Sequence, residues 1–239
     1  MEIPSPPHSA PEPPISVIIP ALNEEHSITG AIESCRDPAV LEIIVVDGGS
    51  RDRTTDQARQ AGARVAGSTA GRAVQMNRGA GLARGNLLLF LHADTRLAPG
   101  FGKEVVCLLG QPDTAAGAFT LKIDGPGRSL RIIEVVAGLR ARWLGLPYGD
   151  QVLFVRSELF HRMGGFPELP IMEDFVLVRR LARFGRIRIS PLSALTSARR
   201  WERAGPWRTT LANQLAVAGF LVGISPAKIA AWYRRLTRG

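Results

Sequence analysis

An uninterrupted apolar run that ends abruptly in polar residues constrains the fold of this chain most strongly. Residues Leu87–Leu91 are all apolar, which predicts a strand buried on both faces of a sheet. The polar cluster His92-Ala93-Asp94-Thr95 follows at once, so polar chemistry lies at the carboxyl end of this strand. Ligands bind at that edge in open α/β sheets, because the loops that leave the strand ends form a crevice there.

Two earlier segments show the same pattern. Ile15–Pro20 and Glu42–Val46 are rich in β-branched residues, and the second run is followed by Asp47 and two glycines. A helix capped by Asn23 is expected to follow the first of these strands. Strands that alternate with helices predict a parallel sheet with right-handed connections, which places Asp47 and Asp94 on one rim.

The rest of the chain continues this alternation. Further strands are expected over residues 63–66, 115–123, 152–155 and 186–190, and helices over residues 54–61, 72–80, 99–109 and 129–143. The last of these helices has an apolar stripe that consists of Ile132, Ile133, Val136, Leu139 and Trp143. Such a stripe is typical of a face packed on the core, and the alternative is contact with a membrane or lipid.

The composition limits the classes of partner. The chain has 239 residues, 45% of them hydrophobic, which suffices for one large domain with a sizeable core. Its formal net charge of +9 comes mostly from arginine and suits phosphates, acidic substrates or an anionic membrane surface. Nucleic acid is not expected as a partner, because the arginines are densest in apolar helical segments with few interleaved aromatic residues.

Two features bear on the location of the protein. Residues 1–14 are rich in proline and lack a basic leader and an apolar core, so we expect a disordered tail rather than a secretion signal. Cys35 and Cys107 show no ligand or redox spacing, which fits thiols in a reducing compartment. No run of about twenty apolar residues occurs, so we do not expect a helix that spans a membrane. We expect a cytoplasmic protein.

His92 and Asp94 are candidate metal ligands, since their spacing lets both reach one ion if the backbone turns between them. A plainer alternative is that Asp94 caps a turn and His92 packs at the sheet edge. The helix that begins at Arg72 follows a loop of small residues, and Arg72, Gln75 and Asn77 could hydrogen-bond a diphosphate or a ribose. An ordinary amphipathic helix explains the same pattern.

Three motifs in order give the sequence a family resemblance. Val17–Glu25, Val45–Thr54 and Phe90–Thr95 resemble successive signatures of family 2 glycosyltransferases, and the resemblance covers roughly residues 15–205. It implies the GT-A fold, an α/β fold with a Rossmann-like, mostly parallel sheet flanked by helices, here followed by a C-terminal helical extension over residues 206–239. It also implies an enzyme that uses a nucleotide-diphosphate sugar as donor.

The resemblance implies a donor site at the rim of the sheet. Asp47 would accept a hydrogen bond from the imide of a uracil-like base, which makes a UDP-sugar the favoured donor. Asp94 matches the second acid of the family's Asp-x-Asp motif and would bind Mg²⁺ or Mn²⁺ at the diphosphate, whereas His92 replaces the first acid and gives a softer, less charged site. The residues expected to bind the nucleotide are Pro20, Leu22, Glu24, Asp47, Asp52, Arg72, Asn77 and Ala93.

Two acids at the start of a later helix are expected to carry the catalysis. The family places its catalytic base at the second acid of a Glu-Asp pair, which here is Asp174, with Glu173 orienting or binding the acceptor. Asp174 would remove the proton from the acceptor hydroxyl as it attacks the anomeric carbon from the face opposite the diphosphate. The alternative is that both acids only stabilise the N-terminus of the helix.

Two further motifs are expected near the donor sugar or the acceptor. Asp150 and Gln151 precede a strand, and the alternative role for Asp150 is that of a turn acceptor. Arg200 and Trp201 match the last two positions of the family's Gln-x-x-Arg-Trp segment, so Arg200 could neutralise the diphosphate and Trp201 could stack near the acceptor. The Gln is absent, which favours a single addition over polymerisation. Surface arginines beside a packed Trp are the alternative.

Residues 206–239 are expected to form an amphipathic helical segment. Their apolar residues are flanked by Arg, Lys, Trp and Tyr, which suits an interfacial hairpin that would bring the active site to lipid-linked acceptors. Packing against the catalytic domain, or a homodimer, explains the same pattern.

The predicted function is inverting transfer of a sugar to an acceptor hydroxyl. A sugar nucleotidyltransferase is one alternative, but it would have a glycine-rich loop with a basic residue directly after the first strand, and Pro20–Asn23 is not such a loop. The other alternative is a non-catalytic nucleotide-binding or membrane-peripheral scaffold, which His92 motivates. Asp94, Glu173 and Asp174 argue against loss of catalysis.

Overall fold

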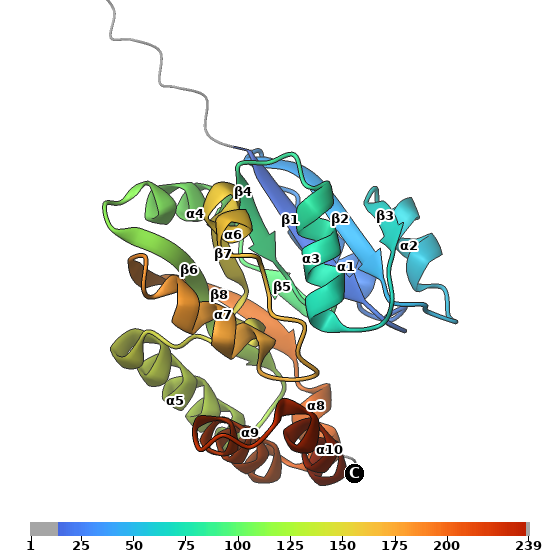
Figure 1. Ribbon diagram of the computed structural model, residues 1–239. Coiled ribbons are helices and arrows are strands. Elements are labelled where there is room, and N and C mark those ends of the chain that lie inside the picture. Colours follow the sequence, from blue (N-terminus) through green and yellow to red (C-terminus); the bar gives the residue numbers. More distant parts are fainter. Residues whose placement is uncertain (1–13, 238–239) are drawn as a thin grey trace, which may run out of the picture.

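An eight-stranded mixed sheet forms the centre of the molecule (Figure 1). The computed structural model describes residues 14–237, so the tail expected over residues 1–14 lies almost wholly outside the described residues. Along the sheet the strands follow the order β3-β2-β1-β4-β7-β6-β8-β5. Their bounds are β1 Ile15–Ala21, β2 Val40–Asp47, β3 Arg64–Gly67, β4 Leu87–Phe90, β5 Thr95–Leu97, β6 Thr114–Asp124, β7 Leu153–Arg156 and β8 Arg186–Ser197.

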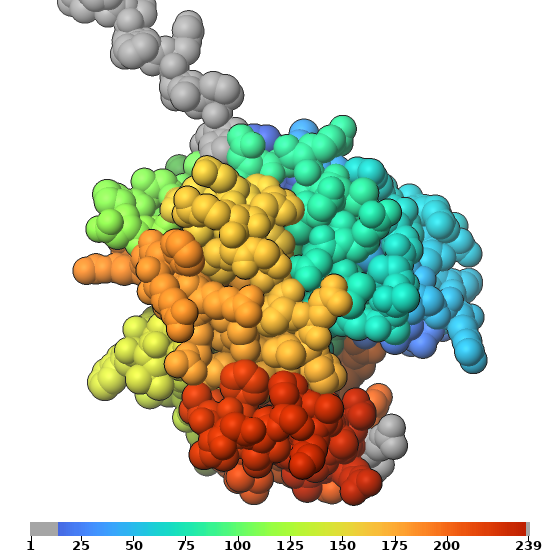
Figure 2. Space-filling model, viewed as in Figure 1, coloured from blue at the N-terminus to red at the C-terminus, as the bar shows by residue number. Residues whose placement is uncertain are grey.

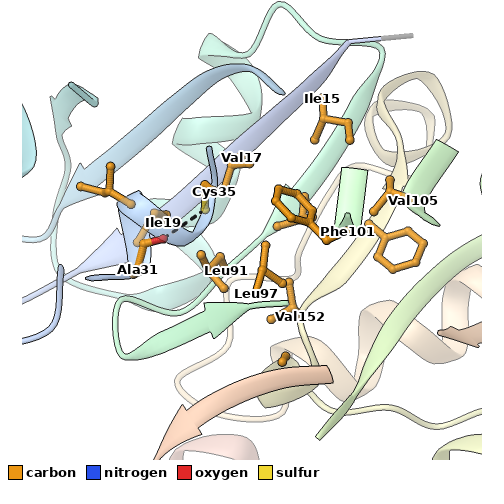
Figure 3. Packing of buried hydrophobic residues seen from close by; sticks show 14 of the residues in the cluster. Ile15, Val17, Ile19, Ala31, Cys35, Leu91, Leu97, Phe101, Val105 and Val152 are labelled. Atoms are coloured by element: carbon orange, nitrogen blue, oxygen red, sulfur yellow. Dashed lines mark hydrogen bonds between the residues drawn. The ribbon is translucent and has the colours of Figure 1, made fainter. Parts of the chain in front are cut away.

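Four neighbouring strands, β3, β2, β1 and β4, are parallel, as the alternation of strands and helices predicts. Alternate residues of β1 point to opposite faces of the sheet and are buried on both. Val17 and Ile19 pack on one face, in the cluster that Figure 3 shows with Phe101 and Val105, and Ile18 packs on the other. Burial on both faces explains why these strands read as continuous apolar runs.

Helices cover both faces of this sheet. On the first face lie α1 (Ile28–Ser34), α2 (Thr54–Gln60) and α4 (Phe101–Gly110). On the second face lie α3 (Arg72–Leu82), α6 (Ser157–Arg162) and α7 (Glu173–Leu181). Gly79 lets α3 approach β1 closely, because a Cβ at that position would lie only 2.4 Å from Cγ2 of Ile18.

The other half of the sheet is mixed. β7 is antiparallel to both β4 and β6, β8 is parallel to β6, and β5 is antiparallel to β8. The expected last strand, residues 186–190, is only the first part of β8, which continues to Ser197 after an irregularity opposite Ala118–Thr120. β5 was not predicted, because three residues that directly follow a polar cluster carry no periodic signal.

Asn23 does not cap a helix, contrary to the expectation from its position. Helix α1 begins only at Ile28, with Ser27 as the preceding residue. Asn23 has a positive φ of 55°, and its side-chain oxygen accepts a hydrogen bond from the backbone N–H of Arg51 at 2.9 Å. Its own N–H donates to Oγ of Ser50 at 2.9 Å, so Asn23 joins the loops after β1 and β2.

Helix α5 (Arg128–Leu144) corrects a second expectation, because most of its apolar stripe faces outward. Ile133 is buried, but the rest of the stripe is exposed, with Trp143 at 82%. The buried face instead includes Glu134, whose carboxylate accepts a hydrogen bond from the backbone N–H of Ile123 at 2.7 Å. A charged residue that satisfies a strand N–H thus turns inward beside Leu130 and Ile133, and the other large apolar side chains of the helix turn outward.

Three helices end the described chain: α8 (Arg199–Ala204), α9 (Pro206–Leu221) and α10 (Pro226–Thr237). They lie together at one end of the molecule (Figure 1), and the space-filling view shows α9 and α10 in red below the gold and orange segment that carries α7 (Figure 2). Ile229 of α10 and Ala216 of α9 pack with Met172 and Phe175 of the α7 segment. Within residues 14–237, no helix has both the length and the hydropathy needed to cross a membrane.

Candidate active site

A cavity of about 720 Å³ opens between the carboxyl end of β4, the start of α7 and the C-terminal helices. It draws its lining from segments far apart in the sequence, as expected for the crevice at the edge of an α/β sheet. Half of the sixteen predicted site residues line it: Glu24, Arg72, His92, Asp94, Asp150, Glu173, Asp174 and Arg200.

The acid pair stands at the start of α7, where both carboxylates have partners in other segments. The Glu173 side chain is 5% exposed and pairs with Nη1 of Arg72 at 3.2 Å. Burial raises the pKa of Glu173, and the Arg72 guanidinium opposes this rise. Half-buried Asp174 accepts a hydrogen bond at Oδ2 from the backbone N–H of Gly149, at 2.6 Å. Long-range partners of this kind exceed what simple stabilisation of a helix terminus requires.

Gly149 determines how closely the neighbouring groups approach. A Cβ at this position would lie 3.1 Å from Oδ2 of Asp174 and 3.3 Å from Nε2 of His92. The absence of a side chain therefore lets the backbone N–H reach the carboxylate. Burial, together with the charges of Arg72 and Arg200, holds the pKa of His92 well below its usual value. Its imidazole is therefore neutral near pH 7, which is the form that can bind a metal.

Asp94 follows β4 and shares a guanidinium with Glu24. Nη2 of Arg199 lies 2.6 Å from Glu24 and 3.4 Å from Asp94, and these contacts, chiefly the hydrogen bond to Glu24, raise the pKa of Arg199. His92 and Asp94 offer one neutral imidazole and one carboxylate. Among residues 14–237 no group of three or more His, Cys, Asp or Glu side chains is arranged to hold an ion. His92 and Asp94 would suit a divalent cation that takes its remaining ligands from outside the protein, as is common for Mg²⁺.

The turn at residues 148–151 divides its two polar side chains between cavity and core. Asp150 lines the cavity, and its Oδ1 is buried without a hydrogen-bond partner among the described residues. Burial raises the pKa of Asp150, against the opposing charges of Arg140 and Arg200. Gln151 instead lies in the core, where Nε2 donates to the carbonyl of Phe119 at 3.2 Å and Oε1 accepts from Arg140 at 3.1 Å. Gln151 therefore fixes the turn and does not reach the cavity.

Asn23 and Glu24, in the loop after β1, line the cavity, whereas the other predicted residues in the loops after β1 and β2 lie outside its lining. Asp47 accepts hydrogen bonds from the N–H groups of Gly49 and Ser50 at 3.0 to 3.2 Å. Asp52 accepts a hydrogen bond from the Thr54 hydroxyl, the largest influence that lowers its pKa. The other predicted nucleotide residues on this rim are the partly buried Pro20, the exposed Leu22 and the buried Ala93.

Two predicted residues are positioned away from the cavity. Asn77 on α3 donates from Nδ2 to the carbonyl of Phe166 at 2.8 Å and accepts from the N–H of Phe166 at 2.9 Å, which anchors the turn before α7. Trp201 is 3% exposed and packs with Leu121 and Ile133 in a separate cluster, so it does not stack in the cavity. The structure thus agrees with the alternative for Trp201, which is a packed side chain beside exposed arginines.

Sequence reasoning missed the wall that the C-terminal helices contribute. Arg199 and Arg203 of α8, Asn213 of α9, and Tyr233 and Arg234 of α10 all line the cavity. The sequence signals them only by the high density of arginine in this segment, a pattern that also suits an interfacial hairpin. Their spacing along three separate helices gives no local motif.

Comparisons with known proteins identify the family and the fold. The model of the family "Glycosyl transferase family 2" matches residues 16–167. Glucosyl-3-phosphoglycerate synthase from Mycobacterium tuberculosis, in complex with Mn²⁺, UDP and glucosyl-3-phosphoglycerate, is 25% identical, with 85% of this chain and 79% of that chain covered and a TM-score of 0.61. No match was found among functionally curated proteins.

Two further structures of that mycobacterial synthase are also similar. The complex with Mn²⁺, UDP-glucose and phosphoglyceric acid is 26% identical, with 87% of this chain and 80% of that chain covered and a TM-score of 0.62. The complex with Mg²⁺ and UDP is 25% identical, with 85% and 79% covered and a TM-score of 0.61. The family match over more than half of the chain, together with the likeness in fold, shows that the chain belongs to glycosyl transferase family 2 and is a glycosyltransferase with the GT-A fold.

Proposed function

We propose that this enzyme transfers a sugar from a UDP-sugar to an acceptor hydroxyl with inversion at the anomeric carbon. The observation that carries the proposal is that Asp174 and Asp94 face one cavity, from the start of α7 and the end of β4. Asp174 is thereby available to accept the acceptor proton, and Asp94 lies at the side proposed for the diphosphate. The complexes of the mycobacterial synthase with UDP and UDP-glucose support uridine as the base.

Asp174 acts as the general base in this proposal. It accepts the proton of the acceptor hydroxyl as that oxygen attacks the anomeric carbon, and the bond to the diphosphate breaks on the opposite face. The 2.6 Å hydrogen bond from Gly149 fixes the carboxylate, and its other oxygen accepts from the N–H of Phe175 at 2.7 Å. Glu173, held by Arg72, orients the acceptor from the adjacent position.

The rim of the parallel strands binds the nucleotide in this proposal. Asp47, Asp52 and the loop that includes Pro20, Leu22 and Glu24 shape the base and ribose pocket beside Ala93. Asp94, with His92 beside it, would hold Mg²⁺ or Mn²⁺, and the bound ion would supply positive charge that stabilises the leaving diphosphate. Arg72 and Arg200 complement that charge from the cavity wall.

Nucleotide binding tests this proposal directly. Calorimetric titration with UDP, GDP and ADP, with and without Mn²⁺, is expected to show binding of UDP that depends on Mn²⁺. Asp94→Ala should lose most of that dependence, whereas Asp56→Ala, a control on the exposed side of α2, should retain it. Equal binding of all three nucleotides would contradict the choice of uridine, and the absence of any nucleotide binding would contradict the donor site.

We also propose that an outer face of α5 and α9, called the apolar face below, contacts an anionic membrane surface. The two helices contact each other. The apolar face consists of residues that are at least 46% exposed: Ile132, Val135, Val136, Leu139, Trp143 and Leu144 of α5, and Trp207, Leu211 and Leu215 of α9. Exposed Arg142 and Arg208 adjoin the two tryptophans in the sequence. Aromatic and basic residues around apolar ones suit the interface of an anionic bilayer.

Helix α9 links the apolar face to the cavity. Its residues Asn213, Ala216 and Val217 line the cavity, whereas Trp207, Leu211 and Leu215 are exposed. An acceptor carried by a lipid would therefore be one helix diameter from the surface that holds its anchor, about 10 Å. This proximity supports a lipid-linked acceptor.

Vesicle flotation tests the membrane proposal. The protein is expected to bind vesicles that contain phosphatidylglycerol more than vesicles of phosphatidylcholine alone, and Trp143→Glu with Leu139→Glu should abolish binding. Phe184→Glu, at an exposed phenylalanine away from the apolar face, is the control and should bind normally. A stable dimer that the two face substitutions dissociate, with no vesicle binding, would contradict membrane contact and favour association of two copies.

A further inference from the structure

The cavity wall opposite the sheet has two arginines that pair with no carboxylate of the described residues and have no part in the proposed donor site. Arg203 of α8 and Arg234 of α10 both line the cavity. No Asp or Glu of the described residues lies within 4.0 Å of either guanidinium. Of the other arginines in the lining, Arg72 pairs with Glu173, and Arg199 pairs with Glu24 and Asp94. Arg200 also lacks a carboxylate partner among the described residues, but the proposed function places it at the diphosphate. Arg203 and Arg234 therefore bring positive charge to the cavity that no side chain of the described chain neutralises.

An amide lines the cavity on the helix between them. The Oδ1 of Asn213 on α9 accepts a hydrogen bond from the Tyr233 hydroxyl at 2.7 Å. This bond fixes the orientation of the amide and leaves its two N–H donors available. The two guanidinium groups and the NH₂ group of Asn213 are all donors, and planar guanidinium groups match phosphate and carboxylate oxygens in geometry.

The same wall is close to the catalytic acids. Ile229 on α10 packs with Met172 and Phe175, the residues that flank the Glu173-Asp174 pair. The donors of α10 consequently lie on the side of the cavity where the base is, and Asp94 at the end of β4 marks the diphosphate side. Arg203 follows Arg199 by one turn of α8, and Arg199 contacts Asp94, so Arg203 borders this side of the cavity from the diphosphate side. A group bound by Arg234 and Asn213 thus belongs to the molecule whose hydroxyl meets Asp174.

We infer that Arg203, Arg234 and Asn213 bind an anionic group, a phosphate or a carboxylate, on the acceptor. This inference rests on the proposed function and adds the chemical class of the substrate. A phosphate on a soluble metabolite and a phosphate on a lipid would present the same oxygens to these donors. The anion subsite, as we call these three residues, holds the acceptor at its charged group while Asp174 meets its hydroxyl.

Ligand titration of the enzyme saturated with UDP and Mn²⁺ tests the anion subsite. Glycerol 3-phosphate and inorganic phosphate represent the soluble source, and vesicles of phosphatidylcholine with phosphatidic acid represent the lipid source. Arg203→Gln with Arg234→Gln is expected to weaken binding of the preferred probe about ten- to hundredfold, since each removes a hydrogen bond to a charged group. Arg235→Gln, an exposed neighbour on α10 outside the cavity lining, is the matched control and should bind as the wild type does.

The possible outcomes separate the inference from the function on which it rests. Weakened binding of either probe in the double variant, with UDP binding unchanged, supports the anion subsite, and the tighter probe identifies the source. Equal binding in the double variant and in Arg235→Gln would overturn it, as would a wild type that binds UDP but neither source of phosphate nor a carboxylate probe such as glycerate. A wild type that binds no nucleotide would instead show that the proposed function has failed.

Discussion

The parallel strands and the C-terminal helices use their polar side chains in opposite ways. At the rim of the parallel strands, Asp47 accepts hydrogen bonds from backbone N–H groups of its own loop, and Asp52 and Asn23 accept them from the neighbouring loop. On the C-terminal wall, Arg203 and Arg234 extend into the cavity without carboxylate partners among the described residues. The first region is therefore organised by its own hydrogen bonds, whereas the second leaves donors available for a ligand. The difference suits a donor site of fixed shape beside a wall that selects the acceptor.

Asp174→Asn is expected to give the largest loss of turnover. It should distinguish the two regions most sharply, because it should affect catalysis without affecting nucleotide binding. Loss of a general base lowers turnover by roughly 10²- to 10⁴-fold, whereas nucleotide binding at the parallel strands should stay within about twofold. Sugar transfer and UDP binding would be measured on the same preparation. Turnover close to that of the wild type would show that Asp174 is not the base.

Gly149→Ala is expected to lower turnover roughly tenfold, because small misplacements of a catalytic group are costly. The new Cβ would press on Oδ2 of Asp174 and on Nε2 of His92. Gly138→Ala in α5, where a Cβ would meet no atom within 4 Å, is the control. Thermal unfolding would accompany the kinetics, and equal loss of activity in both variants would rule out positioning of Asp174 as the cause.

Glu42→Ala tests how much the internal hydrogen bonds of the parallel strands contribute to stability, and how this contribution depends on pH. Glu42 accepts hydrogen bonds from the Ser16 hydroxyl at 2.9 Å and from the N–H of Arg84 at 2.7 Å. Burial opposes ionisation of Glu42, but these bonds and the Arg84 charge outweigh it and lower its pKa. The variant is expected to lose about 1–3 kcal/mol in the free energy of unfolding at pH 7.

The sign of the pH dependence follows from the lowered pKa. The contribution of Glu42 is complete above its unfolded pKa of about 4.3 and is lost as the pH falls through the lower folded pKa. The difference in the free energy of unfolding between wild type and Glu42→Ala, measured by urea unfolding, should therefore shrink as the pH is lowered below 5. Glu33→Ala, at an exposed position of α1, is the control, and a difference independent of pH would contradict this account.

Trp201→Phe is expected to have the smallest effect on catalysis, with turnover changed by less than about threefold. Trp201 is buried away from the cavity, and its indole Nε1 has no hydrogen-bond partner among the described residues. Phenylalanine keeps most of the packed apolar surface and removes a buried donor, so the two effects on stability partly cancel. A large change in the KM for the acceptor would instead place Trp201 at the acceptor.

Local patterns predicted the parallel strands, the order of the helices and the position of the acid pair. Each of these depends on neighbours in the sequence: apolar runs for β1, β2 and β4, and Glu173 at the start of α7. The outward face of α5 was not predictable in this way, because the inward turn of Glu134 depends on a strand N–H at Ile123.

The cavity shows the same limit. Motifs indicated Asp94 and Asp174, which follow a buried strand and begin a helix. Arg203, Asn213 and Arg234 come from three helices, and only the packing of α9 and α10 against α7 brings them together. Asn77 fits the sequence pattern of a ligand-binding residue, yet its amide is used by Phe166, a contact 89 residues away in the chain.

Helix α9 presents its two sides to different surroundings within only 16 residues. Asn213, Ala216 and Val217 face inward, and Trp207, Leu211 and Leu215 face outward. Because successive residues of a helix point in different directions, a substitution on one side leaves the other side nearly unchanged. Selection can therefore alter which molecule enters the cavity without altering the outer surface, so substrate choice and surface association can diverge independently among related enzymes.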